Sequence, residues 1–111
     1  MDKNLIKNSA VSLQDALSFR NKAKKEKKTF VLTNGCFDLL HSGHVFSLIE
    51  ASKLGDYLWV AINSDSSIKN LKGPKRPIVN EIDRAYLLTS LSCVAGVTIF
   101  NLHDNYSYSK V

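Results

Sequence analysis

Two histidines, His41 and His44, flank Gly43 at a point where an apolar run gives way to a glycine-bearing turn and then to a helical pattern. A helix N-terminus presents unpaired N–H groups and partial positive charge, so it is a site for phosphate oxygens. Gly43 allows a phosphate to approach the backbone, and two imidazoles on the first turn can donate hydrogen bonds to a phosphate whose charge grows during nucleophilic attack. The spacing therefore predicts a phosphate-binding site whose chemistry is positioning and charge neutralisation.

A basic segment further along the chain could supply more phosphate ligands. Residues 66–79 contain Gly73, Pro74 and Pro77 among several cations, a composition that predicts an irregular loop. Lys72 and Arg76 in this segment could simply keep a loop soluble. Because a glycine and two prolines restrict the backbone around them, we favour a phosphate clamp.

Other chemistries compete for the same residues. Paired imidazoles can hold a metal ion, but only Asp38 joins the histidines at ligand spacing, so the sequence predicts no metal site of the protein's own. Cys36 could be a nucleophile, although a small buried thiol is the more common state of such a residue. Cys36 and Cys93 form neither a Cys-x-x-Cys pair nor a disulfide framework, and both are expected to be reduced.

Hydrophobic periodicity indicates the elements that must position these groups. Ser12 and Asp15 resemble a capping box at the start of an amphipathic helix. The predicted elements are a helix over 12 to about 25, a strand over Thr29–Thr33, a helix over His44–Leu54, a strand over Tyr57–Ile62, a helix from an Asn80 cap to Leu91, and a strand over Gly96–Phe100.

Strands that alternate with helices predict an α/β fold with a parallel sheet and right-handed crossovers. Ligands of such sheets bind beyond the carboxyl ends of the strands. The polar junctions at 34–44 and 63–77 both follow strands, so both are predicted at that edge. No further strand is predicted in the polar tail from Asn101 to Val111.

Composition sets the remaining limits. A length of 111 residues suits one compact domain, and 44% hydrophobic with 23% charged residues is ordinary for a globular protein. No run approaches the roughly 18 apolar residues of a membrane span, and no signal-peptide core begins the chain, so we expect a cytoplasmic protein with no membrane partner. The net charge of +5 suggests an anionic partner. Because no aromatic residues interleave the basic run at 22–28, we interpret that run as a solvated helix end and expect no nucleic-acid partner.

Several strings, in their order, resemble the cytidylyltransferase-like nucleotidyltransferases, and most of all the adenylyltransferase domain of ADP-heptose synthase. They are Asn34-Gly35-Cys36-Phe37-Asp38, His41-x-Gly-His44, Asn63-Ser64-Asp65, Leu71-Lys72-Gly73-Pro74-x-Arg76-Pro77-Ile78 and Asp83-Arg84. The likeness runs from about Ser12 to Phe100. It implies a Rossmann-like α/β nucleotidyltransferase domain of the HxGH type at 29–111, preceded at 1–28 by an amphipathic helix and a basic connector. The family's Lys-Gly-Gly-Asp-Tyr-like strand end and Ser-Thr-Thr helix start have no counterpart here, so the domain is expected to be incomplete at its C-terminus and to stop after the third strand.

The resemblance also implies roles for individual residues. His41 and His44 would stabilise the α-phosphate transition state, Lys72 would hold phosphate oxygens, and Arg84 would neutralise triphosphate or product charge. Asp38 would lie near the sugar phosphate and Asp65 at the border of the substrate pocket. The residues implied to bind the nucleotide and its phosphates are Thr33, Asn34, Gly35, Cys36, Phe37, Gly43 and Arg76.

The implied activity is transfer of AMP from ATP to heptose 1-phosphate, giving ADP-heptose and pyrophosphate, with Mg²⁺ accompanying the triphosphate. The resemblance also implies a homodimer, and an exposed strand edge would independently favour self-association. Two alternatives stay open. One is a cytidylyltransferase acting on glycerol 3-phosphate or an amino-alcohol phosphate, and the other is a non-catalytic nucleotide-binding module.

Overall fold

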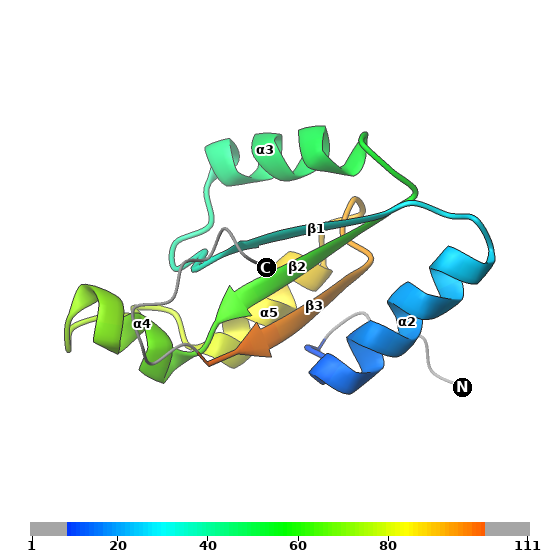
Figure 1. The fold of residues 1–111 in the computed structure, drawn as a ribbon. Helices are drawn as coiled ribbons and strands as arrows, with labels where there is room; N and C mark the ends of the chain where they lie inside the picture. Colours follow the sequence, from blue (N-terminus) through cyan, green and yellow to red (C-terminus); the bar gives the residue numbers. More distant parts are fainter. Residues whose placement is uncertain (1–8, 102–111) are drawn as a thin grey trace.

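The structure, a computed structural model, describes residues 9–101 and forms an α/β arrangement (Figure 1). Its elements are α2 (Leu13–Lys25), β1 (Phe30–Gly35), α3 (Ser42–Ser52), β2 (Tyr57–Asn63), α4 (Asp65–Lys72), α5 (Glu81–Thr89) and β3 (Gly96–Phe100). The three strands form one parallel sheet in the order β1-β2-β3. The predicted α/β class with a parallel sheet is confirmed.

The main core lies between the sheet and helices α3 and α5. Along β2, Leu58, Val60 and Ile62 alternate onto this face and are at most 1% exposed. They cluster with Leu48 of α3 and Leu88 of α5. Burial of each such side chain contributes roughly 1.5–3 kcal/mol to folding. This apolar face therefore stabilises the sheet, and the polar loops begin where its strands end.

Helix α2 covers the opposite face of the sheet. The Trp59 ring of β2 lies 5.0 Å from the Phe19 ring of α2, measured between centroids. The Trp59 Nε1–H donates to Thr98 Oγ1 at 3.0 Å, so the buried indole has a polar partner. As predicted, Ser12 caps this helix, and its Oγ accepts from the Asp15 N–H at 3.0 Å.

The two edge strands differ on their outer sides. The Val97 carbonyl of β3 accepts from the Val11 N–H at 2.9 Å, so the segment before α2 lies against that edge. Within residues 9–101, β1 pairs only with β2. The outer edge of β1 therefore has no strand partner in the described part of the chain.

The prediction of an irregular loop over 66–79 was wrong for its first half. Helix α4 occupies Asp65–Lys72, and the Ser64 hydroxyl caps it by accepting from the Ser67 N–H at 3.1 Å. Ile68 is fully buried and anchors the helix. The glycine and prolines that follow end this helix and do not prevent it, since Gly73 takes a φ of 102° that other residues avoid.

Other predicted boundaries shift by two residues. β1 runs on to Gly35, α3 starts at Ser42, and α5 ends two residues short of Leu91, while β3 has the predicted bounds. Expectations for the tail beyond Asn101 fall outside the described residues. Among the helices of residues 9–101, none has the length and apolar character needed to cross a bilayer.

Candidate functional site

His41 and His44 lie together at the start of α3, shortly after β1 ends. His41 is the N-cap, and its Nδ1 accepts from the Gly43 N–H at 3.0 Å, while Nδ1 of His44 accepts from the His41 N–H at 3.2 Å. The two rings stack with their centroids 3.9 Å apart. This is a reciprocal capping arrangement built from two imidazoles. The expected pairing of the histidines on the first turn is present.

These hydrogen bonds also set which ring nitrogens carry protons. A nitrogen that accepts from a backbone N–H carries none, so each neutral ring has its proton on Nε2. Burial, and after it the neighbouring His41, lower the pKa of His44, while the backbone of Leu39 acts in the opposite direction. The lowered pKa and the accepting Nδ1 therefore favour a neutral His44 ring with its proton on Nε2.

Two glycines and a phenylalanine shape this turn. Phe37 has a φ of 50°, in the left-handed region, and its ring lies 5.2 Å from that of His44. A Cβ on Gly35 would meet the Phe37 ring at 2.9 Å, and a Cβ on Gly43 would meet the His41 ring at 2.9 Å. A side chain at either glycine would therefore force the neighbouring ring to shift from its position over the backbone.

A cavity of about 340 Å³ opens where β1 and β2 end, and it is lined by Asn34, Gly35, Cys36, Asn63, Leu71 and Lys72. Asn34 Nδ2 is buried without a hydrogen-bond partner. Such a donor costs about 1–3 kcal/mol until an acceptor reaches it. The carboxamide of Asn63 is engaged with Ser67 and Cys36, so the lining offers one cation, Lys72, and one unpartnered amide donor, Asn34, to oxygens of a ligand.

Asp38, expected near a substrate, is engaged by the chain itself. Its Oδ1 accepts from the N–H groups of Ile78 and Val79 at 2.8 and 2.9 Å, and its Oδ2 accepts from Arg76 Nη1 at 2.9 Å. Burial alone would raise the pKa of Asp38, but the hydrogen bonds from Val79, Arg76 and Ile78 and the charge of Arg76 hold the pKa below its ordinary value. Asp38 therefore fastens the loop at 73–79 to the end of β1.

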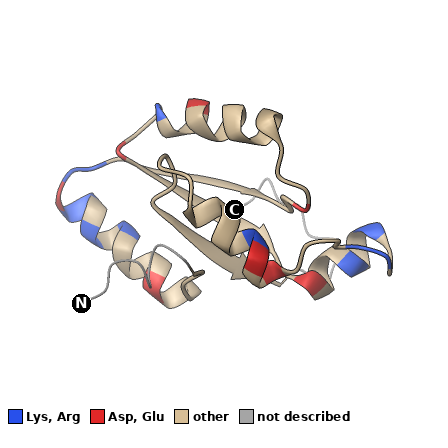
Figure 2. Cartoon of the chain, turned by 180° about the vertical axis from the view of Figure 1, so that it is seen from behind, with Lys and Arg blue, Asp and Glu red and all other residues tan. Residues whose placement is uncertain are grey.

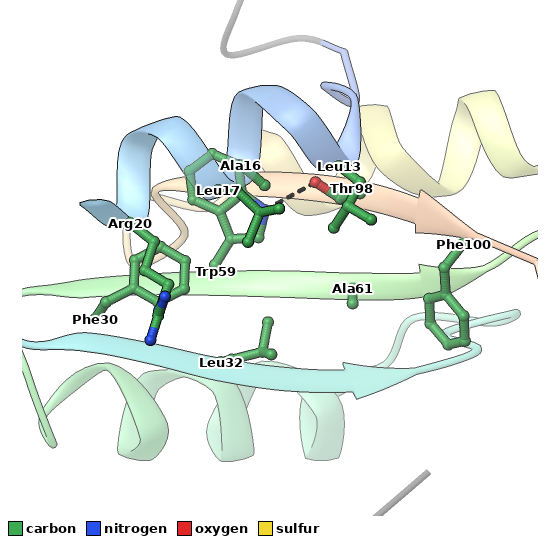
Figure 3. Close-up of a pocket in the computed structure, with 10 residues that line it drawn as sticks. All are labelled: Leu13, Ala16, Leu17, Arg20, Phe30, Leu32, Trp59, Ala61, Thr98 and Phe100. Carbon is green, nitrogen blue, oxygen red and sulfur yellow. Dashed lines mark hydrogen bonds between the residues drawn. The ribbon is translucent and has the colours of Figure 1, made fainter. Parts of the chain in front are cut away.

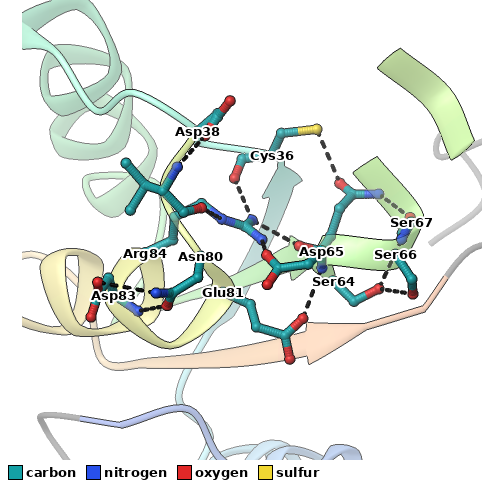
Figure 4. Close-up of polar contacts among 12 residues, drawn as sticks. Cys36, Asp38, Ser64, Asp65, Ser66, Ser67, Asn80, Glu81, Asp83 and Arg84 are labelled. Carbon is teal, nitrogen blue, oxygen red and sulfur yellow. Dashed lines mark hydrogen bonds and ion pairs between the residues drawn. The ribbon is translucent and has the colours of Figure 1, made fainter. Parts of the chain in front are cut away.

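Arg84, expected to neutralise phosphate charge, has a side chain that is 0% exposed. Its Nε donates to the Val79 carbonyl at 2.8 Å, and its Nη1 donates to the carbonyls of Cys36 and Asn63 at 2.8 and 2.7 Å. Nη2 donates to Asp65 Oδ1 at 2.7 Å (Figure 4). Four of its five N–H groups are thus used within the chain. This arrangement differs from the expected phosphate contact, because the residues around the guanidinium separate it from solvent.

Asp65 links α4 to α5 and does not line the cavity. Besides accepting from Arg84, it donates its own N–H to Glu81 Oε1 at 2.7 Å. Thr33, inside β1, does not line the cavity either. Arg76 is 42% exposed and turned toward Asp38. Of the residues expected to bind a ligand, Asn34, Gly35, Cys36 and Lys72 share the cavity.

Charge is divided between neighbouring helices (Figure 2). Lys69 and Lys72 lie in the last turn of α4, whereas Glu81 and Asp83 lie in the first turn of α5. Lys22, Lys24 and Lys25 lie in the last turn of α2, where the sequence predicted a solvated, basic helix end. Lys72 is the cation of the cavity lining.

A second cavity of about 260 Å³ lies between α2 and the sheet (Figure 3). Its lining is Leu13, Ala16, Leu17, Arg20, Phe30, Leu32, Trp59, Ala61, Thr98 and Phe100. Arg20 is the charged member of this set, and the remainder is mostly apolar. An anionic ligand is better matched by the cavity at the strand ends.

Sequence reasoning missed several contributors. Asn63 could have been found, because a polar residue at the end of a buried strand lies at the ligand edge of a parallel sheet. Leu71 belongs to the cavity wall only because α4 is helical. Val79 contributes through its backbone, for which its side-chain type gives no signal.

The sequence predicted no metal site of the protein's own and two reduced cysteines. No group of three or more His, Cys, Asp or Glu side chains arranged to hold a metal ion occurs among residues 9–101. Cys36 and Cys93 are free thiols, as expected.

The sequence is similar to bifunctional HldE proteins from several bacteria. "Bifunctional protein HldE" of Helicobacter pylori (strain P12) is 60% identical over 75 residues, which cover 68% of this chain and 16% of that protein. The protein of the same name from Syntrophotalea carbinolica is 50% identical over 90 residues, which cover 81% of this chain and 18% of that protein. The chain therefore spans less than a fifth of the length of either relative.

The fold is also similar to that of a solved structure. The lipopolysaccharide core biosynthesis protein from Thermoplasma volcanium GSS1 superposes with a TM-score of 0.61 at 32% identity, covering 75% of this chain and 64% of that one. Residues 32–104 match the cytidylyltransferase-like family, and this range includes the histidine turn, the cavity at the strand ends and Arg84. The chain therefore belongs to the cytidylyltransferase-like family.

Proposed function

We propose that this domain, related to the HldE proteins, transfers AMP from ATP to a sugar 1-phosphate, namely heptose 1-phosphate, and releases pyrophosphate. The observation that carries the proposal is the stacked pair of His41 and His44. Both Nδ1 atoms accept from backbone N–H groups, so the Nε2–H of the exposed His41 is left as a donor at the start of an 11-residue helix, whereas the His44 ring also makes a backbone hydrogen bond with Leu39. The likeness to HldE proteins supports the choice of ATP and a heptose phosphate.

In the proposed reaction a phosphate oxygen of the sugar phosphate attacks the α-phosphorus of ATP. A new O–P bond forms as the α-phosphorus bond to the bridging oxygen breaks, and that electron pair leaves with pyrophosphate. Charge on the α-phosphate oxygens is offset by the imidazole donors and by the helix N-terminus. Mg²⁺ enters as part of the triphosphate substrate, held mostly by phosphate oxygens and water.

The cavity at the strand ends is proposed to receive oxygens of the substrates. Lys72 supplies a positive charge for a phosphate, and the Asn34 carboxamide suits a hydroxyl or phosphate oxygen. The unpartnered Nδ2 of Asn34 supports this assignment, because a ligand acceptor would remove its desolvation cost.

The test is Mg²⁺-dependent pyrophosphate release from ATP with heptose 1-phosphate. Removal of one donor to a developing oxyanion commonly costs about 100-fold or more in rate, so His41→Ala and His44→Ala should each lose activity on that scale. Lys53→Ala, an exposed residue at the far end of α3, is the matched control. If the two histidine variants and the control release pyrophosphate alike, the proposal is lost.

Two other functions are decided by the same assay. A preference for CTP with glycerol 3-phosphate or an amino-alcohol phosphate would replace the adenylyl proposal with a cytidylyl one. ATP binding without turnover would favour a non-catalytic nucleotide-binding module.

We also propose that the chain self-associates through β1. This strand has no partner on its outer side within the described residues and carries no charged side chain, so nothing on it opposes pairing with a second β1. Sedimentation should show a dimer or larger species, and Leu32→Lys should shift it toward monomer. A monomeric wild-type chain would contradict this proposal.

A further inference from the structure

We propose that Arg84 and Asp38 form a backbone clamp that positions the loop at 73–79, and with it Arg76, over the carboxyl edge of the sheet. Arg84 is then a positioning residue that acts through the chain's own carbonyls. Its part in nucleotide binding is indirect, and that part of the inference rests on the proposed function.

The clamp closes on Val79 from two sides. The Val79 N–H donates to Asp38 Oδ1 at 2.9 Å, and the Val79 carbonyl accepts from Arg84 Nε at 2.8 Å. Asp38 follows β1, whereas Arg84 comes from α5. The loop is therefore held between two separate elements at one residue, while Asp38 also binds Arg76.

Arg84 carries this restraint into the ligand cavity. Its Nη1 donates both to the Cys36 carbonyl after β1 and to the Asn63 carbonyl that ends β2. Cys36 and Asn63 are both cavity residues. One guanidinium therefore links the cavity residues Cys36 and Asn63 to the loop at 73–79 through its hydrogen bonds, which Figure 4 draws as dashed lines.

The chemistry of the side chain explains why an arginine occupies this position. A buried cation is costly to desolvate, and here the cost is offset by Asp65 and by three carbonyl acceptors. A planar guanidinium presents five N–H groups in fixed directions, whereas a lysine ammonium is a single compact centre. An ammonium at Arg84 could keep the charge but could not span Val79, Cys36 and Asn63 together.

The discriminating variant is Arg84→Lys in the full chain, compared with Arg20→Lys, the same change at an exposed residue of α2. Amide hydrogen exchange is followed by NMR at Ile78 and Val79, and ATP·Mg²⁺ binding is measured by calorimetry. The clamp predicts faster exchange at both amides and an ATP affinity lowered about tenfold or more, the scale of one lost hydrogen bond to a charged group when the loop and cavity walls are displaced. Arg20→Lys makes the same chemical change on the opposite face of the sheet, outside the strand-end cavity, so it should bind ATP within about threefold of wild type and leave the exchange unchanged.

The result that overturns the clamp is an Arg84→Lys protein with wild-type exchange and wild-type ATP affinity, since a retained charge would then suffice. If Arg84→Lys does not fold, Asp38→Ala releases the same Val79 backbone from the other side and must accelerate exchange at Val79. Unchanged exchange in that variant also rejects the clamp. A wild-type chain that fails to bind ATP would remove the proposed function, and the exchange measurements would still decide the clamp.

Discussion

The histidine turn and the Arg84 cluster both lie where strands of the sheet end, yet they treat their hydrogen-bond donors in opposite ways. In the histidine turn, backbone N–H groups occupy the Nδ1 acceptors, and the Nε2 donor of the exposed His41 remains. In the Arg84 cluster, four guanidinium N–H groups are spent on the protein itself. On our proposals, the first region receives an anion and the second holds the loops around the strand-end cavity in position.

The comparison teaches that residue type and strand-end position do not by themselves assign a role. His41 and Arg84 were both expected to meet phosphate, but the His41 residue is exposed and the Arg84 side chain is 0% exposed. Burial and the direction of the donors separate a group that acts on a ligand from a group that acts on the backbone.

The largest expected difference between the two regions is in stability. Arg84→Met removes the partner of Asp65 and the donor to three carbonyls, and breaking such a buried pair costs about 3–5 kcal/mol in the free energy of unfolding. His41→Ala removes an exposed N-cap, which costs about 0.5–2 kcal/mol. Urea denaturation of both variants checks the order. Equal losses would break the distinction between a structural and a ligand-facing region.

A smaller effect is expected from Asp38→Asn, and it should depend on pH. Since the folded-state pKa of Asp38 lies below its ordinary value of about 3.9, the carboxylate stabilises the fold fully above that value and loses this contribution as pH falls through the folded-state pKa. The Asn variant should be about 1–3 kcal/mol less stable at neutral pH, because a charge-assisted acceptor for Arg76 and Val79 is lost. Denaturation at a series of pH values should show that the difference in unfolding free energy between wild type and Asp38→Asn narrows only in strong acid. A gap that stays constant down to that range would contradict the contribution assigned to this carboxylate.

The smallest expected effect sharpens the histidine side of the comparison. The folded-state pKa of His44 is lowered, so the unfolded chain takes up a proton first as pH falls below about 6.5. Stability should therefore decline from that pH toward the folded-state pKa, and His44→Gln should lack this component. The same pH series measures it, and identical slopes for wild type and His44→Gln would show that burial of the ring has no such consequence.

Much of this fold follows from local pattern. The β3 bounds, the Ser12 cap and the parallel sheet were predicted, because buried strands and caps leave signals within a few residues. Helix α4 was missed because residues 66–79 were treated as one irregular segment, whereas the glycine and two prolines that make it irregular all lie after the helix ends. The pairing of the histidines was predictable from their spacing on a helix turn.

The Arg84 cluster could not be predicted in the same way. Its acceptors are backbone carbonyls of Cys36, Asn63 and Val79, which lie far apart in sequence and are brought together only by the fold. Side-chain types carry no information about which carbonyls are left without a partner at strand ends. The family likeness supplied the position of Arg84, and the packing around it supplied the role that we propose.

The most direct test of the central claim is an NMR titration of the chain with ATP·Mg²⁺, repeated with His41→Ala and His44→Ala. The account predicts that the largest backbone shifts fall within residues 34–44 and around Lys72, and that each substitution weakens binding by about tenfold or more, the scale of one lost charge-assisted hydrogen bond. Shifts that gather instead along the apolar cavity under α2, or histidine variants that bind ATP as tightly as wild type, would contradict it.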